Sequence, residues 1–168
     1  TVAACAPDPP APAAGAPPPT GGPAVAVTPY ADVSLPDPPL VAMADATGVD
    51  DAVLAFGLAT DGTCAPAWGG TVAVDDPGIT DQAAALRNRG GRLTVATGGA
   101  SGDYLENTCD TASDLAGAYT RLLDATGATG LDVDVETDIP DETVVAALQQ
   151  VQQQRGGHVS LTLQVADQ

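Results

Sequence analysis

The chain has 168 residues, which fits one domain with a tail, and its 22 acidic and 5 basic residues give a net charge of −17 at pH 7. A polyanion of this kind lacks the cationic surface that binds nucleic-acid backbones or anionic lipids, so we expect no nucleic-acid partner. Hydrophobic residues make up 44 % of the chain, which excludes disorder throughout. No apolar run reaches about 18 residues, so we expect no transmembrane segment.

Proline dominates the N-terminal segment, residues 1–24. Repeated prolines among Ala, Gly and Thr fix φ and remove backbone donors, so this segment is predicted to be a disordered, polyproline-like linker. Within it, Val2-Ala3-Ala4-Cys5 resembles the end of a lipoprotein signal, which makes Cys5 a candidate lipid anchor. An incidental cysteine in a low-complexity tail is the alternative.

From residue 25 onward, strand patterns and helix patterns alternate. Short apolar runs rich in β-branched residues predict strands, and segments with helical spacing between them predict helices. The strands are expected at 24–35, 51–59, 91–99, 129–136 and 157–165, and the helices at 40–48, 79–90, 111–127 and 141–156. This alternation predicts a parallel α/β fold, either a doubly wound sheet or a (β/α) barrel. No glycine-rich phosphate motif accompanies it, so we expect no nucleotide and no cofactor.

The segment GLDVDVE, residues 130–136, carries three carboxylates at alternate positions. In a strand, Asp132, Asp134 and Glu136 therefore share one face, about 6.5–7 Å apart. Clustered carboxylates raise one another's pKa, so one of them can stay protonated near neutral pH as a general acid. Glu136 ends the strand, where barrel enzymes keep catalytic groups. A solvated sheet edge and a Ca²⁺ site are the alternatives, but Thr137 stands where a calcium loop needs glycine, so we expect no metal.

Residues 129–136 resemble the DGxDxDxE motif of glycoside hydrolase family 18, the chitinases and their relatives. The resemblance extends over residues 25–168 through the segments 29–35, 54–70, 94–102 and 105–119, which are similar to secreted chitinase-like proteins of actinobacteria. It implies a (β/α)8 TIM-type barrel. Because about five strands and four helices are readable and a barrel needs eight of each, we expect an incomplete barrel that corresponds to its N-terminal portion.

The resemblance also implies roles for the acidic residues. Glu136 would be the proton donor to the glycosidic oxygen, Asp134 would orient the substrate's N-acetyl group, and Asp132 would tune Asp134. The implied activity is substrate-assisted hydrolysis of β-1,4-linked N-acetylglucosamine polymers. Thr129 and Ala96 depart from the family pattern, which has Asp and Ser there. A non-catalytic carbohydrate-binding protein of the cell envelope is therefore the alternative.

Four further residues are candidate substrate contacts. Trp68 could stack on a sugar face or cover the loop above the barrel, and Tyr30 could contact substrate or serve packing. Gly98 and Gly99 lie at the end of the third predicted strand, where they permit close packing at the barrel mouth.

Cys64 and Cys109 follow the second and third predicted strands. Their loops emerge at the same end of a barrel, so we expect a disulfide between them. A disulfide and the family resemblance predict a secreted or extracellular protein, or else a surface lipoprotein anchored through Cys5. The predicted partner is a polysaccharide, chitin or N-acetylglucosamine oligomers.

Overall fold

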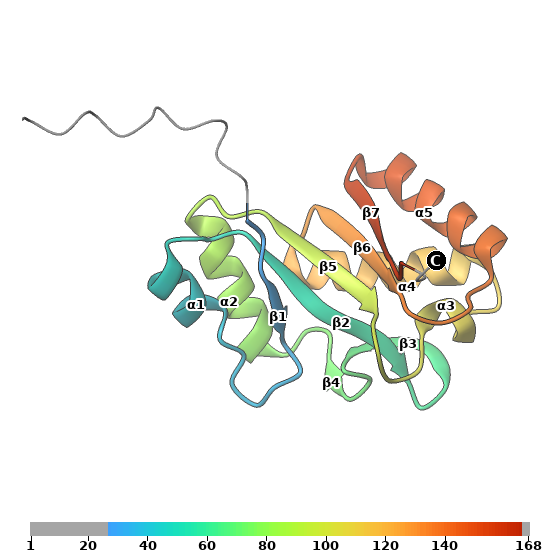
Figure 1. Cartoon of the computed structure of the whole chain (residues 1–168), viewed down its shortest axis with the longest axis horizontal. Coiled ribbons are helices and arrows are strands. Elements are labelled where there is room, and N and C mark those ends of the chain that lie inside the picture. Colours follow the sequence, from blue (N-terminus) through green and yellow to red (C-terminus); the bar gives the residue numbers. More distant parts are fainter. Residues whose placement is uncertain (1–26, 166–168) are drawn as a thin grey trace, which may run out of the picture.

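The computed structural model describes residues 27–165, in which seven strands and five helices follow one another (Figure 1). The strands are β1 (Tyr30–Asp32), β2 (Ala52–Thr60), β3 (Thr63–Trp68), β4 (Val72–Ala73), β5 (Leu93–Gly98), β6 (Gly130–Val135) and β7 (His158–Leu163). The helices are α1 (Leu40–Thr47), α2 (Pro77–Asn88), α3 (Leu105–Thr108), α4 (Ala112–Thr126) and α5 (Asp141–Arg155). None of these helices is both long and apolar enough to cross a membrane. The predicted linker at 1–24 and Cys5 lie outside the described residues.

The five predicted strands are parallel neighbours in chain order, β1-β2-β5-β6-β7. This is the order of consecutive βα units in a barrel. The sheet curls so far that the hydroxyl of Tyr30 on β1 lies 3.4 Å from the hydroxyl of Thr162 on β7. Within the described residues these two strands do not pair, so the sheet stays open. The predicted incomplete barrel of the α/β class is confirmed.

A hairpin that the sequence analysis assigned to a loop follows β2. Strand β3 runs antiparallel to the C-terminal half of β2, and β4 pairs with β3. The turn between β2 and β3 holds Asp61 and Gly62, whose φ angles are +49° and +67°. Positive φ at both central residues is the requirement of a tight hairpin turn, and Asp-Gly is a preferred pair for it. The strict alternation of strand and helix was therefore wrong for residues 61–76.

Local signals explain where α2 begins and where α4 begins and ends. Asp76 caps α2 by accepting a hydrogen bond from the backbone N–H of Gly78 at 2.8 Å, and Pro77 occupies the first helical position. Thr111 caps α4 by accepting from the N–H of Asp114 at 3.1 Å. Helix α4 ends at Gly127, which adopts the left-handed conformation.

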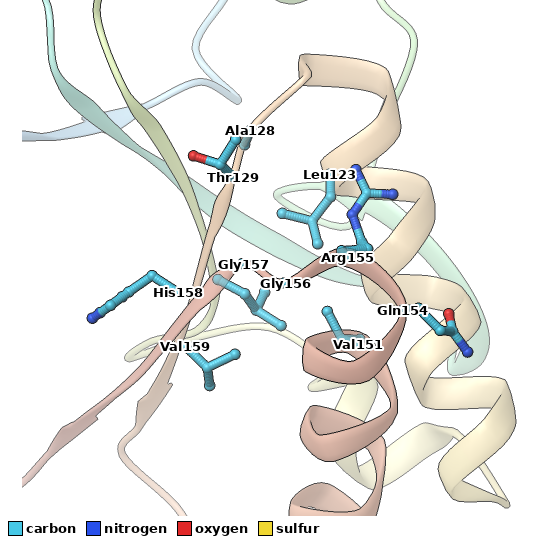
Figure 2. A pocket seen from close by; sticks show the side chains of 11 residues that line it. Leu123, Ala128, Thr129, Val151, Gln154, Arg155, Gly156, Gly157, His158 and Val159 are labelled. Atoms are coloured by element: carbon cyan, nitrogen blue, oxygen red, sulfur yellow. The ribbon is translucent and has the colours of Figure 1, made fainter.

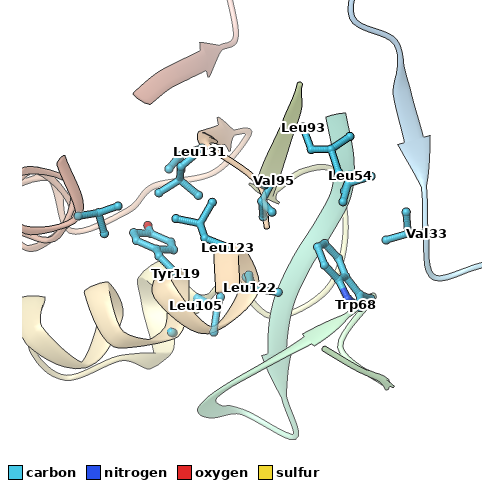
Figure 3. Packing of buried hydrophobic residues seen from close by; sticks show 14 of the residues in the cluster. Val33, Leu54, Trp68, Leu93, Val95, Leu105, Tyr119, Leu122, Leu123 and Leu131 are labelled. Carbon is cyan, nitrogen blue, oxygen red and sulfur yellow. The ribbon is translucent and has the colours of Figure 1, made fainter. Parts of the chain in front are cut away.

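The hydrophobic core lies between the sheet and the layer of helices α1, α2, α4 and α5 (Figures 1 and 3). Alternate residues of the central strands point into it, including Val95 from β5 and Leu131 from β6, and Leu122 of α4 meets them from the helix layer. Within residues 27–165, the opposite, concave face of the sheet carries a small apolar cluster of Val53, Ala55 and Ala96, against which Phe56 packs. That face is therefore free to carry polar groups.

Trp68 belongs to this core and is fully buried, with 0 % of its surface exposed. Its indole Nε1 donates to the carbonyl oxygen of Val74 at 3.3 Å. The prediction that Trp68 stacks on a sugar was wrong, because the residue lies in β3 with its ring among the core residues rather than in a loop above the barrel (Figure 3).

The predicted disulfide is present. Cys64 and Cys109 are bonded, with their Cα atoms 4.7 Å apart and 45 positions apart in sequence. Cys64 lies within β3 rather than in a loop, and Cys109 directly follows α3. The bond therefore fastens the hairpin to the short helix at the C-terminal end of β5.

Candidate active site

Three acidic residues of β6 form a row on the concave face of the sheet. Asp132 and Asp134 are only 4 % and 9 % exposed, while Glu136, directly after the strand, is exposed. Strand β6 lies between β5 and β7, so the row sits inside the sheet and not at its edge. The alternative of a solvated edge is therefore wrong for the two aspartates. We call Asp132, Asp134 and Glu136 the acidic row.

Burial raises the pKa of Asp134, and the neighbouring charges of Glu136 and Asp132 raise it further. The carboxyl group in the middle of the row therefore holds a proton more readily than a free aspartate does. A proton held there lies close to Glu136, the one carboxyl group of the row that solvent reaches freely. The arrangement can keep one transferable proton among three carboxylates.

Asp132 is bound by three hydroxyl groups. The hydroxyls of Tyr30 and Thr162 donate to its Oδ2 at 2.8 and 2.9 Å, and the Ser160 hydroxyl donates to its Oδ1. Burial is the main cause that raises the pKa of Tyr30, and the charge of Asp132 adds to it, so the phenol remains a donor. Tyr30 thus lies beside the acidic row, 6.1 Å from the ring of Phe56.

The hydroxyl of Tyr104 joins the ends of β5 and β6. It lies 2.7 Å from the carbonyl oxygen of Gly99 and 3.0 Å from that of Asp134, and it accepts the backbone N–H of Glu136 at 3.1 Å. The residue is only 5 % exposed. Tyr104 therefore fixes the point at which Glu136 leaves the sheet. The sequence analysis missed this role because the two residues are 32 positions apart and no local sequence pattern predicts their contact.

The two glycines at the end of β5 allow a close approach between strands. Gly98 and Gly99 have φ angles of +85° and +92°. A Cβ at Gly98 would collide with the carbonyl group of Asp134, and one at Gly99 would press on the ring of Phe56 at 3.1 Å. Close packing at the mouth of the barrel is therefore the observed arrangement.

Two hollows near the acidic row share the loop that follows β5. One of about 320 Å³ adjoins Glu136 and is lined by loop 99–103, Tyr104 and Asn107. The other, of about 580 Å³, lies between Tyr30, Phe56 and loop 100–102. Both lie at the C-terminal ends of the strands, where barrel enzymes bind their substrates.

A third hollow, of about 410 Å³, lies at the other end of the strands, between the C-terminal parts of α4 and α5 (Figure 2). His158 and Arg155 line it together with apolar residues. This hollow lies at the N-terminal end of β6, whereas Glu136 follows its C-terminal end. His158 therefore takes no part in the acidic row. Within residues 27–165, no group of three or more His, Cys, Asp and Glu side chains is arranged to hold a metal ion.

Comparisons with known proteins point in one direction. No model of a protein family matches the chain. The probable bifunctional chitinase/lysozyme of Escherichia coli (strain K12) is 33 % identical over 110 residues, which are 64 % of this chain and 12 % of that protein. The catalytic domain of a hyperthermophilic chitinase from Pyrococcus furiosus superposes with a TM-score of 0.74 at 37 % identity, over 81 % of this chain and 45 % of that one.

Catalytic-site mutants of active domain 2 of the thermostable Pyrococcus furiosus chitinase, complexed with chito-oligosaccharides, superpose equally well, with a TM-score of 0.74 at 36 % identity. The ICChI chitinase from Ipomoea carnea, at 18 % identity and a TM-score of 0.54, shares the fold. The chain is therefore similar in sequence and in its barrel-type α/β fold to the chitinases of glycoside hydrolase family 18. It spans 45 % of the length of the Pyrococcus structures.

Proposed function

We propose that this chain carries the acid-bearing part of a chitinase-type glycoside hydrolase that cleaves β-1,4-linked N-acetylglucosamine polymers. The observation that carries the proposal is the acidic row: two buried aspartates lead to an exposed glutamate at the C-terminal end of a central strand. The chito-oligosaccharide complex of the Pyrococcus relative supports the substrate class. A disulfide supports an extracellular location, while the lipid anchor at Cys5 remains a prediction.

In the proposed reaction, the proton held on Asp134 passes to Glu136, which gives it to the glycosidic oxygen as the bond to C1 breaks, and Asp134 is left as a carboxylate. The carbonyl oxygen of the substrate's own N-acetyl group forms the new bond to C1, and Asp134 stabilises the resulting oxazolinium cation. Water then opens this ring and transfers a proton back to Glu136, which restores the starting state. The returned proton is again held by Asp134, whose pKa is raised by burial and by its two carboxylate neighbours, Glu136 and the buried Asp132. Tyr30, Gly98 and Gly99 would border the bound sugar.

The substitution Glu136→Gln tests this function in a protein that contains this chain within a closed barrel, which we call the full-length protein. It keeps the shape of the side chain and removes the transferable proton, so hydrolysis should fall by a factor of about 10²–10⁴. The assay is release of a chromophore from an N-acetylglucosaminide oligomer, with binding measured by calorimetry. Glu142→Gln, the same change at an exposed position in the first turn of α5, is the matched control.

Full activity in Glu136→Gln would place the acid elsewhere and overturn the proposal. A wild-type protein that binds the oligomer without releasing the chromophore would favour the carbohydrate-binding alternative.

A further inference from the structure

The neighbours of Asp132 in the sheet differ sharply in chemistry. In register, Asp132 lies between Ala96 of β5 and Ser160 of β7. Ala96 is fully buried in the small apolar cluster of the concave face and has no polar side-chain atom. The described hydrogen bonds to the Asp132 carboxylate therefore come from β7, through Ser160 and Thr162, and from β1, through Tyr30.

These hydroxyls donate to both oxygens of the Asp132 carboxylate, and Asp132 is only 4 % exposed. Hydroxyl donors favour the charged form of the carboxylate that accepts them, and water has little access to replace a lost donor here. Ser160 lies opposite Asp132 and Thr162 opposite Asp134 in the pairing of β6 with β7. Both oxygens are therefore fixed by two side chains of one strand.

We propose that Ser160 and Thr162 are positioning residues of the acidic row, which hold Asp132 as a fixed anion so that the proton of the row resides on Asp134. Strand β7 thereby takes over a task that β5, with Ala96 beside Asp132, is unable to perform. The inference deepens the proposed function, on which its catalytic meaning rests. It does not need turnover for its test.

Titratable and charged groups near the acidic row could also decide which aspartate holds the proton. The titratable groups beside the row are Tyr30 from β1, which donates to Asp132, and Tyr104 after β5, which interacts with the charges of Asp134 and Glu136. His158 begins β7 at the opposite end of the strand pair, beside Gly130. The ion pairs of arginines in the described part of the chain join Asp45, Asp50, Asp51 and Asp124. None of these four aspartates belongs to the row. Two features therefore distinguish Asp132 from Asp134: Asp132 accepts three hydroxyl donors, and Asp134 has a carboxylate neighbour on each side along β6.

The test is a pH titration of the two aspartate carboxyl carbons by NMR in the chain itself, without substrate. In the wild type, the first proton that enters the pair should reside on Asp134. In Ser160→Ala and in Thr162→Val, loss of one hydroxyl should move the ratio of proton occupancies about tenfold toward Asp132. Asp132→Asn and Asp134→Asn assign the two signals.

Two variants control for a general change in the sheet. Ser160→Thr retains the hydroxyl and should keep the wild-type ratio. Thr94→Val makes the same change as Thr162→Val on β5, beside Gly130, and should leave the ratio unchanged. An unchanged ratio in both Ser160→Ala and Thr162→Val, or an equal shift in Thr94→Val, would overturn the inference. Because no hydrolysis is measured, this outcome is independent of that of the chitin-oligomer assay.

Discussion

The disulfide between Cys64 and Cys109 should stabilise the fold by an amount that follows from the length of the loop it closes. It closes a loop of 45 positions. In the chain-entropy account, a loop of that length removes about 13 cal/mol/K from the unfolded state, which is about 4 kcal/mol at 25 °C. A domain of this size is stable by about 5–15 kcal/mol, so the bond supplies a large fraction of the total. The double substitution Cys64→Ala, Cys109→Ala should therefore lower the melting temperature by about 8–16 °C.

Urea unfolding measures the change in the free energy of unfolding directly. The comparison is made in a Cys5→Ser background, so that the third thiol is unable to exchange with the bond. Reduction of the parent protein should reproduce the loss, and the same reductant should leave the double variant unchanged. A loss below about 1 kcal/mol in the double variant would refute the loop argument, because it would mean that the unfolded chain gains little freedom when the bond is absent.

Three further predictions concern the acidic row and its supports. Tyr104→Phe removes the acceptor of the Glu136 N–H, so the free energy of unfolding in urea should fall by about 1 kcal/mol. In the full-length protein, kcat should fall at constant KM. An unchanged kcat would contradict the role of this hydroxyl. Gly98→Ala places a Cβ at φ +85° against the carbonyl of Asp134 and should destabilise the fold by more than about 1 kcal/mol. Gly117→Ala, a change in α4 with open space around the added Cβ, should instead stabilise the fold by about 0.5–1 kcal/mol. Asp134 binds its proton more tightly in the folded state than in the unfolded state, so its contribution to stability is lost as the pH rises from the unfolded pKa of 3.8 through the raised folded pKa. Asp134→Asn should therefore be more stable than the wild type at pH 7, with the advantage disappearing below about pH 4, as read from unfolding curves over that pH range; a constant difference would contradict it.

The features that the sequence predicted correctly depend on short-range patterns. The five parallel strands follow from apolar, β-branched runs, and the acidic row follows from the period of two in residues 130–136. The disulfide was predicted because the segments after two consecutive parallel strands emerge on the same side of the sheet, and the bond is present although Cys64 lies in β3 rather than in a loop. Each of these inferences needs only the fold class and a position within one strand.

Most of what was missed depends on contacts between distant segments. One omission was local: Asp61-Gly62 is a hairpin signal that the sequence analysis did not use, so the segment after it was assigned to a loop and Trp68 was misplaced with it. The hydroxyl of Tyr104 meets Glu136 across 32 positions, and the hydroxyl of Ser160 meets Asp132 across 28. The register of β6 and β7 sets the Ser160 pair, and the path of the loop between β5 and α3 sets the Tyr104 pair; no local pattern in one sequence specifies either.

The central claim is that the acidic row hydrolyses N-acetylglucosamine polymers with the substrate's N-acetyl group as nucleophile. The most direct test follows the anomeric configuration of the first product by NMR while the full-length protein acts on a chitin oligomer. Two successive displacements at C1 retain the configuration, so the newly formed end should appear as the β-anomer before it equilibrates. The Glu136→Gln variant should give no product above buffer on the same timescale. An α-anomer formed first, or an absence of hydrolysis by the wild-type protein, would contradict the account.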